Sequence, residues 1–408
     1  MLQYINNKKN GDNMNRFLNF TYAAVQGFYW MYFAVIISFA SVFLLDRGYS
    51  NSQIGFILAF ANILAVLIQP VLADIADRSK KLSLISVVYV MGAALILGTG
   101  SLYFMDQRSI VLTSVFVLTG ALQISLQPLI NSIAFHFSKA GSYINFGATR
   151  SVGSVAYALI SSILGALVLA FGTKTIPLTG VIVIVLLLSA LFFTDKLFKK
   201  ELTVHIPDSS FDEPHEDAAI TLLQFMKRNK VFVVLTLGIM LVFFQNAVIN
   251  NFLIQILRNI GGDSSQMGRL FSFMALLEMP GLFFFSKLRK RFSSQAMLKL
   301  SSLAFIGKVF FTYLAPSVGF VYLAFLFQLI SFPLFLSSAV HLADEVMEKG
   351  EAVKGQSLVT GMMTLSGVFA SLLGGAVLDL GGPSQLLLIS TVLAVIGTVS
   401  IFLTVNRV

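Results

Sequence analysis

Long apolar segments without charge constrain this chain more than any other feature of its sequence. Each of them approaches or exceeds the roughly 20 residues that a transmembrane helix needs. Only 12% of the 408 residues are charged and 56% are hydrophobic, which leaves too little charge to cover a soluble protein of this length. The sequence therefore predicts an all-α integral membrane protein with twelve spans. The predicted spans are residues 19–45, 53–73, 82–105, 109–135, 143–173, 175–194, 231–257, 266–286, 297–315, 317–342, 355–378 and 383–404.

The distribution of Lys and Arg predicts the topology. If the N-terminus is cytoplasmic, 21 of the 28 Lys and Arg residues fall in inner segments and 5 in outer loops, while Arg150 and Lys308 lie within spans. Cytoplasmic loops of membrane proteins carry such an excess of positive charge. We therefore expect both termini in the cytoplasm and the chain in the cytoplasmic membrane. The same bias accounts for the net charge of +9 without a nucleic-acid partner.

One long polar segment divides the predicted spans into two groups of six. Residues 195–230 contain Pro207, Pro214 and the acidic run FDEPHED (211–217), and we interpret them as a solvated cytoplasmic linker. The predicted domains are a cytoplasmic tail (1–18, with Met1 or Met14 as the start), a first six-helix bundle (19–194), the linker and a second bundle (231–404). Two parallel halves of this kind typically hold a substrate site at mid-depth between them.

Enzyme and metal chemistry have little support in the sequence. The chain has no cysteine, which excludes disulfides and thiolate metal sites. Zinc-protease, nucleophile-elbow and phosphate-loop motifs are also missing. The four histidines fall at predicted helix ends or in the linker. We expect no cofactor, no bound metal, no ATP-driven step and no enzymatic activity.

The loop after the second predicted span has a recognisable charge pattern. The segment ADIADRSKK (73–81) resembles the G-x-x-x-D-[RK]-x-G-[RK]-[RK] loop of the major facilitator superfamily. Ala73 replaces the first glycine and the second is missing, and ordinary positive-inside charge would give a similar pattern. The resemblance implies a cytoplasmic gate formed by Asp77, Arg78, Lys80 and Lys81.

A second resemblance lies in NFGATRSVGSVAYALISSILG (145–165), where Arg150 is a charge in an apolar helix. This segment is similar to the [YF]-G-x-x-R-x-x-G-S-x-[GA]-[YW] signature of the branch that contains lactose permease, phenylpropionate permease and nucleoside–proton symporters. The resemblance implies that Arg150 and Tyr157 contact substrate, Arg150 through its planar donors and Tyr157 by stacking. The alternatives are an Arg150 that reaches the membrane interface and a Tyr157 that only packs.

The branch places a carboxylate on the fourth span opposite this arginine, whereas the present chain has Asn131 there. An amide cannot neutralise Arg150. Two interpretations remain open: the substrate carries the missing negative charge, or neutral polar groups and water suffice.

The second half contains two intramembrane charges, Glu278 and Lys308. Their spans form a predicted hairpin that turns near residues 291–292, which puts the two residues within ~4–5 Å of the same depth. We expect an ion pair that shifts with protonation or substrate binding; a purely structural salt bridge is the alternative.

Polar residues complete the predicted site in this half. In the resemblance, Asn246, Gln328, Ser331 and Met363 stand where the branch has proton-site Asp, His, Glu and Lys, which leaves Glu278 as the intramembrane carboxylate. The predicted substrate-contacting side chains outside the fifth span are Asn131, Gln245, Asn246, Asn250 and Gln328.

These features together predict a secondary transporter. We expect H⁺-coupled symport of a small polar solute by alternating access, with a sugar or oligosaccharide ahead of nucleosides and aromatic acids. The partners are the solute, H⁺ and the lipid bilayer, and the expected state is a monomer. The alternatives are an efflux carrier for amphiphilic compounds and a membrane sensor that does not transport.

Overall fold

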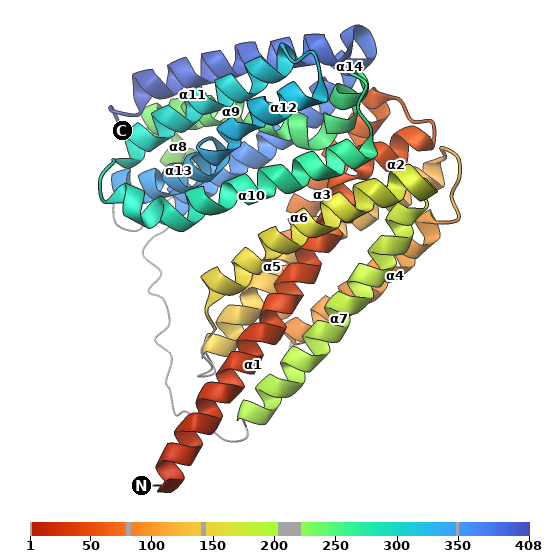
Figure 1. Ribbon diagram of the computed structural model, residues 1–408. Helices are drawn as coiled ribbons and strands as arrows, with labels where there is room; N and C mark the ends of the chain where they lie inside the picture. The colour runs from red at the N-terminus through yellow and green to blue at the C-terminus, as the bar shows by residue number, and fades with distance from the viewer. Residues whose placement is uncertain (1, 79–82, 140–143, 203–221, 348–350) are drawn as a thin grey trace. The chain divides into compact units, whose positions relative to one another are not determined.

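The computed structural model describes residues 2–78, 83–139, 144–202, 222–347 and 351–408, and among these residues it contains helices and turns but no strand. The all-helical prediction is confirmed. The contacts divide the chain into two compact units, each built of helices (Figure 1). The first unit comprises Met1–Gly48 and Phe60–Asp212, and the second comprises Tyr49–Ala59 and Glu213–Val408.

In the first unit, α6 and α7 pack against α1, and α4 packs against α5 and α7. Polar side chains start two of these helices, since Ser83 and Asn145 each accept a hydrogen bond from a free backbone N–H of the first turn. The helices are α1 (Leu2–Phe33), the π-helix η1 (Ala34–Ser38), α2 (Ala40–Asp46), α3 (Asn51–Arg78), α4 (Leu84–Leu102), α5 (Ile110–Lys139), α6 (Phe146–Phe171) and α7 (Thr175–Leu202). The first turns of α3 belong to the second unit.

In the second unit, α9 and α14 pack closely because glycines line their contact. A Cβ atom added to Gly397 would lie 2.6 Å from the carbonyl oxygen of Gly238, so the two backbones meet there. The helices of this unit are α8 (Leu222–Arg228), α9 (Lys230–Arg258), α10 (Ser264–Arg289), α11 (Ser294–Tyr313), α12 (Val318–Phe325), the 3₁₀ turn η2 (Leu326–Leu329), α13 (Phe332–Val346) and α14 (Ala352–Thr404).

Two breaks shape the helices of the second unit. Pro333 has no N–H to donate to the carbonyl of Leu329, and the predicted span 317–342 accordingly divides into α12, η2 and α13. In α14, Gly382 has φ 72° and ψ −175°, a conformation that only glycine adopts readily. Leu358 and Ile401 on either side of it belong to one core cluster, although a straight helix would separate them by ~65 Å. The chain therefore reverses at Gly382.

Eleven helices among the described residues are long and apolar enough to cross a membrane, with the whole of α14 counted once. Many of their large apolar side chains are exposed, including Phe283, Leu380 and Leu97. Such a surface is stable against lipid rather than water, so the protein is a multi-pass membrane protein.

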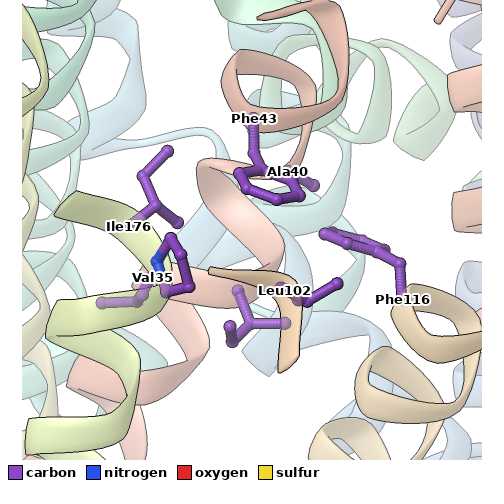
Figure 2. A pocket seen from close by; sticks show the side chains of 8 residues that line it. Val35, Ala40, Phe43, Leu102, Phe116 and Ile176 are labelled. Atoms are coloured by element: carbon purple, nitrogen blue, oxygen red, sulfur yellow. The ribbon is translucent and has the colours of Figure 1, made fainter. Parts of the chain in front are cut away.

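The core of the first unit is tightly packed where η1 meets α2. Figure 2 shows the side chains that line a narrow space there, among them Val35, Phe43, Leu102, Phe116 and Ile176. The residues that line this space are all apolar, and it does not admit a water molecule. It is a feature of packing and offers no binding site.

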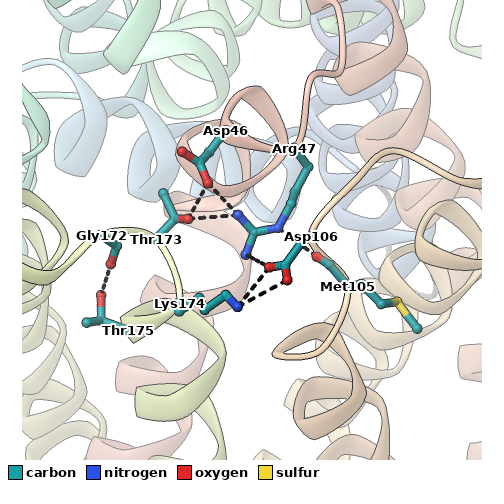
Figure 3. A network of polar contacts seen from close by, with 8 residues as sticks. All are labelled: Asp46, Arg47, Met105, Asp106, Gly172, Thr173, Lys174 and Thr175. Carbon is teal, nitrogen blue, oxygen red and sulfur yellow. Dashed lines mark hydrogen bonds and ion pairs between the residues drawn. The ribbon is translucent and has the colours of Figure 1, made fainter.

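A polar network joins three connections of the first unit at one end (Figure 3). Arg47, after α2, donates to the carbonyl of Met105 at 2.7 Å, to Thr173 Oγ1 at 3.0 Å and to the carboxylate of Asp46. Lys174 forms an ion pair with Asp106 at 3.0 Å. The side chain of Arg47 is only 3% exposed, so its charge is held inside this network. The network fixes the turns that follow α2, α4 and α6.

Candidate functional site

One face of α1 carries a row of polar and aromatic side chains at helical spacing. Tyr22, Gln26 and Trp30 are four residues apart and therefore lie on the same side of the helix. Gln26 Nε2 donates to Tyr22 Oη at 2.8 Å and to Asn131 Oδ1 at 3.1 Å, while Tyr22 Oη donates to the carbonyl of Ile130 at 2.9 Å. This network ties α1 to α5 and holds the predicted site residue Asn131 in place.

Arg150 and Trp30 form the centre of the polar region in the first unit. The guanidinium carbon of Arg150, in the second turn of α6, lies 4.0 Å from the centroid of the Trp30 ring. This is a cation–π contact, in which the electron-rich ring face supports the positive charge. Gly153 makes room for the ring, because a Cβ atom there would lie 2.4 Å from Trp30 Cδ1. We refer to Tyr22, Gln26, Trp30, Asn131 and Arg150 as the first polar cluster.

Two buried polar atoms of this cluster have no hydrogen-bond partner among the residues that the structure describes. They are the acceptor Gln26 Oε1 and the donor Trp30 Nε1. Buried groups of this kind are nearly always paired in native proteins, so each unpaired one is a candidate for a ligand contact.

Tyr157 lies one helical turn beyond Gly153 and makes a different contact. Its hydroxyl is 2.9 Å from Ser38 Oγ, and Ser38 is the last residue of the π-helix η1. Short π-helical segments within α-helices are frequent at functional sites. The side chain of Tyr157 is half-buried, and its ring is not the one stacked on Arg150.

The second unit brings four predicted residues into one chain of contacts, which we refer to as the second polar cluster. Lys308 on α11 is fully buried and donates from Nζ to Asn246 Oδ1 at 3.1 Å and to Gln328 Oε1 at 2.8 Å. Gln328 Nε2 in turn donates to Glu278 Oε1 at 2.7 Å. The amide of Gln328 thus links the ammonium group to the carboxylate. The predicted partners Glu278 and Lys308 are connected through a neutral side chain.

The break at η2 positions Gln328 for this role. The residue lies within the 3₁₀ turn between α12 and α13, and it is 1% exposed. The oxygen of an amide can accept a hydrogen bond from one group while its nitrogen donates to another. A hydroxyl would have to make both hydrogen bonds through a single oxygen atom. Glu278 on α10 is half-buried, whereas Asn246 on α9 is 2% exposed.

The remaining predicted residues take other places. Gln245 is completely buried next to Asn246, and neither of its amide atoms has a hydrogen-bond partner among the described residues. Asn250, expected to share a face with Asn246, is exposed. Asp77 and Arg78 end α3, and Lys80 and Lys81 lie outside the described residues.

Sequence reasoning missed Tyr22, Gln26, Trp30 and Ser38. A signal for three of them was present, because polar and aromatic residues recur every four positions in the first span and Trp30 is the sole tryptophan of the chain. Ser38 had no such signal, since its role depends on the π-helical turn. Within the described residues there is no group of three or more acidic or histidine side chains placed to hold a metal ion.

Comparison with known proteins gives consistent relatives. The model of the MFS_1 like family matches residues 22–389. The maltose permease of Geobacillus stearothermophilus is 23% identical over 389 residues, which cover 92% of this chain and 93% of that protein.

Solved structures share the fold at low sequence identity. The nucleoside transporter NupG superposes with a TM-score of 0.75 at 15% identity, covering 95% of this chain and 98% of that one. A bacterial homologue of the human lysosomal transporter Spinster gives a TM-score of 0.67 at 16% identity, with coverage of 96% and 97%. These proteins are membrane transporters rather than enzymes. Because the family model spans most of its length, the chain belongs to the MFS_1 like family and is a transporter of the major facilitator type.

Proposed function

We propose that this protein is an H⁺-coupled symporter that takes up a small, neutral, hydroxylated solute across the cytoplasmic membrane, with a sugar or oligosaccharide as the favoured substrate. It would act as a monomer, by alternating access, in the manner of the lactose permease branch. The observation that carries the proposal is the first polar cluster, in which Arg150 rests on Trp30 beside a buried acceptor and a buried donor that lack partners.

The chemistry of that cluster favours a neutral substrate over an anionic one. The ring of Trp30 supports the guanidinium charge by a cation–π contact, so Arg150 does not depend on a substrate carboxylate for stabilisation. Gln26 Oε1 needs a donor and Trp30 Nε1 needs an acceptor. A hydroxyl group supplies both functions, and adjacent hydroxyls of a sugar match the paired donors of a guanidinium.

The printed name of one relative agrees with this choice. The maltose permease is 23% identical over nearly the whole chain, and maltose is a neutral disaccharide. Nucleosides also bear neighbouring hydroxyls, and the structurally similar protein NupG is named a nucleoside transporter. They are therefore the second choice of substrate.

The second polar cluster supports H⁺ coupling through Glu278. A fully buried ammonium group is costly unless charge and hydrogen bonds compensate for lost hydration. Lys308 receives two amide oxygens, and Glu278 reaches it through Gln328. When Glu278 takes up a proton, it loses the negative charge that holds the Gln328 amide, and the support of Lys308 weakens. Protonation and the arrangement of α10, η2 and α11 are thereby coupled.

The decisive experiment is uptake into proteoliposomes with an imposed pH gradient. Maltose, uridine and benzoate represent the three substrate classes, and Arg150→Ala is compared with Arg291→Ala, an exposed arginine outside both clusters. We expect gradient-driven uptake of the sugar that is lost only in Arg150→Ala. Uptake of benzoate alone would contradict the neutral-substrate proposal, and binding without flux would identify a sensor instead.

A further inference from the structure

A pocket rimmed by positive charge lies at one end of the second unit, and no residue of the second polar cluster lines it. Lys227 and Arg228 come from the end of α8, Lys230 begins α9, and Arg407 follows α14. The pocket has a volume of about 560 Å³, and its remaining lining includes the apolar side chains of Val231 and Met347. We refer to it as the basic pocket. The four basic residues belong to segments that the distribution of Lys and Arg assigns to the cytoplasm.

The positive charge of the basic pocket is only partly neutralised within the protein. Arg228 forms an ion pair with Glu351 at 3.2 Å, and Glu351 is itself 8% exposed. The structure gives no ion pair to Lys227, Lys230 or Arg407 among the residues it describes, and all three side chains are exposed. The pocket is therefore complementary to an anion.

An apolar strip continues from this pocket along two helices. Val231, Val234 and Leu237 follow one another on α9, and Val399 and Leu403 lie on the last part of α14; their exposed fractions range from 40% to 59%. The helices are locked together here, because Ser400 Oγ donates to the carbonyl of Val234 at 3.2 Å and Gly238 contacts Gly397. In a membrane protein, such a strip lies against acyl chains.

We infer that the basic pocket binds the phosphate headgroup of an anionic phospholipid of the cytoplasmic leaflet, with its acyl chains along the apolar strip. Basic pockets between helices on the cytoplasmic side hold anionic headgroups through the same combination of charge and depth. The strip distinguishes a lipid from a soluble anion, which would gain nothing from the adjoining apolar surface. Lys230 and Arg407 are placed to contact the phosphate while their aliphatic stems cover the apolar side of the pocket.

The test uses the full-length protein in a neutral detergent. Dioctanoyl phosphatidylglycerol is titrated while native mass spectrometry counts bound lipid, and dioctanoyl phosphatidylcholine serves as the neutral lipid. The test variant Lys230→Gln/Arg407→Gln is compared with Lys290→Gln/Arg291→Gln, which removes the same two charges from an exposed site after α10. Near a membrane each basic residue is worth roughly fivefold in affinity, so we expect roughly 30-fold weaker phosphatidylglycerol binding in the test variant alone.

Equal phosphatidylglycerol binding by both double variants would overturn the inference. So would inorganic phosphate binding that matches phosphatidylglycerol binding in strength and in its dependence on Lys230 and Arg407. Complete displacement of the lipid by an acidic peptide of residues 208–218 would overturn it as well. The exchange Lys230→Arg/Arg407→Lys keeps the charge and should keep lipid binding, so loss of binding in that variant would also count against the proposal. Sugar uptake need not change in any of these variants.

Discussion

Gly153 on α6 faces the indole ring of Trp30 on α1 at a distance that leaves no room for a side chain. A Cβ atom at Gly153 would lie 2.4 Å from Trp30 Cδ1, closer than Cβ contacts found in proteins, and 3.1 Å from Cγ. The glycine is therefore what allows the ring to lie under Arg150. The glycine in the 145–165 signature thus has a structural reason that involves another helix.

Replacing Gly153 by alanine should displace the ring and weaken substrate binding. We expect the dissociation constant for the sugar to rise about 2- to 30-fold, the range covered by one cation–π contact. Isothermal titration of the purified protein measures it. Gly361→Ala on α14 is the matched control, because a Cβ atom there meets nothing within 4 Å. Equal effects of the two substitutions would contradict the role given to Gly153.

Trp30 itself offers a graded test of the same contact. Trp30→Phe keeps an aromatic face for Arg150 but removes the indole donor, whereas Trp30→Leu removes both. We expect Trp30→Leu to weaken sugar binding by up to about 30-fold and Trp30→Phe to have an intermediate effect. A substrate-dependent thermal shift ranks the three proteins. If Trp30→Leu bound sugar as well as the unaltered protein, Trp30 would have no part in recognition.

Glu278→Gln should separate coupling from translocation. The substitution keeps the size of the side chain and a hydrogen-bond acceptor for Gln328, but it removes the titrating group and the negative charge that compensates Lys308. We expect loss of pH-driven accumulation while sugar exchange across the membrane continues. Counterflow and gradient-driven uptake in the same proteoliposomes measure the two activities. Glu345→Gln is the control, since Glu345 pairs with Arg289 in an exposed position at the end of α13. Unchanged accumulation in Glu278→Gln would exclude Glu278 from coupling.

The network in Figure 3 predicts unequal costs for two cations. Arg47→Met removes a buried guanidinium and leaves the carbonyl of Met105 and the hydroxyl of Thr173 without their donor, so it should lower the free energy of unfolding by ~1–3 kcal/mol. Lys174 is 48% exposed, and Lys174→Met should cost ~0–1 kcal/mol because water screens its pair with Asp106. Denaturant titration in detergent compares the two. A cost for Lys174→Met equal to that for Arg47→Met would show that burial does not govern this network.

The sequence predicted the polar centre of the second unit better than that of the first. The sequence predicts all four of its members (Lys308, Glu278, Asn246 and Gln328) as site residues, because a polar or charged residue in an apolar span is conspicuous. Their order of contact was not predictable, since it depends on Pro333 breaking the span so that Gln328 lies between the charges. In the first unit Arg150 is conspicuous for the same reason, but its contact with the ring of Trp30 is not predictable from the sequence.

The sequence alone determined that the chain is helical and inserted in a membrane, because apolar length and charge placement set the cost of leaving water and need no knowledge of packing. Only the tertiary structure decided which side chains meet. In a soluble protein the apolar face of a helix indicates the direction of its core, but in lipid both faces are apolar and the rotation of each helix is hidden. Close contacts such as that of Gly153 with Trp30 settle that rotation, and with it the identity of the partners of Arg150 and Lys308.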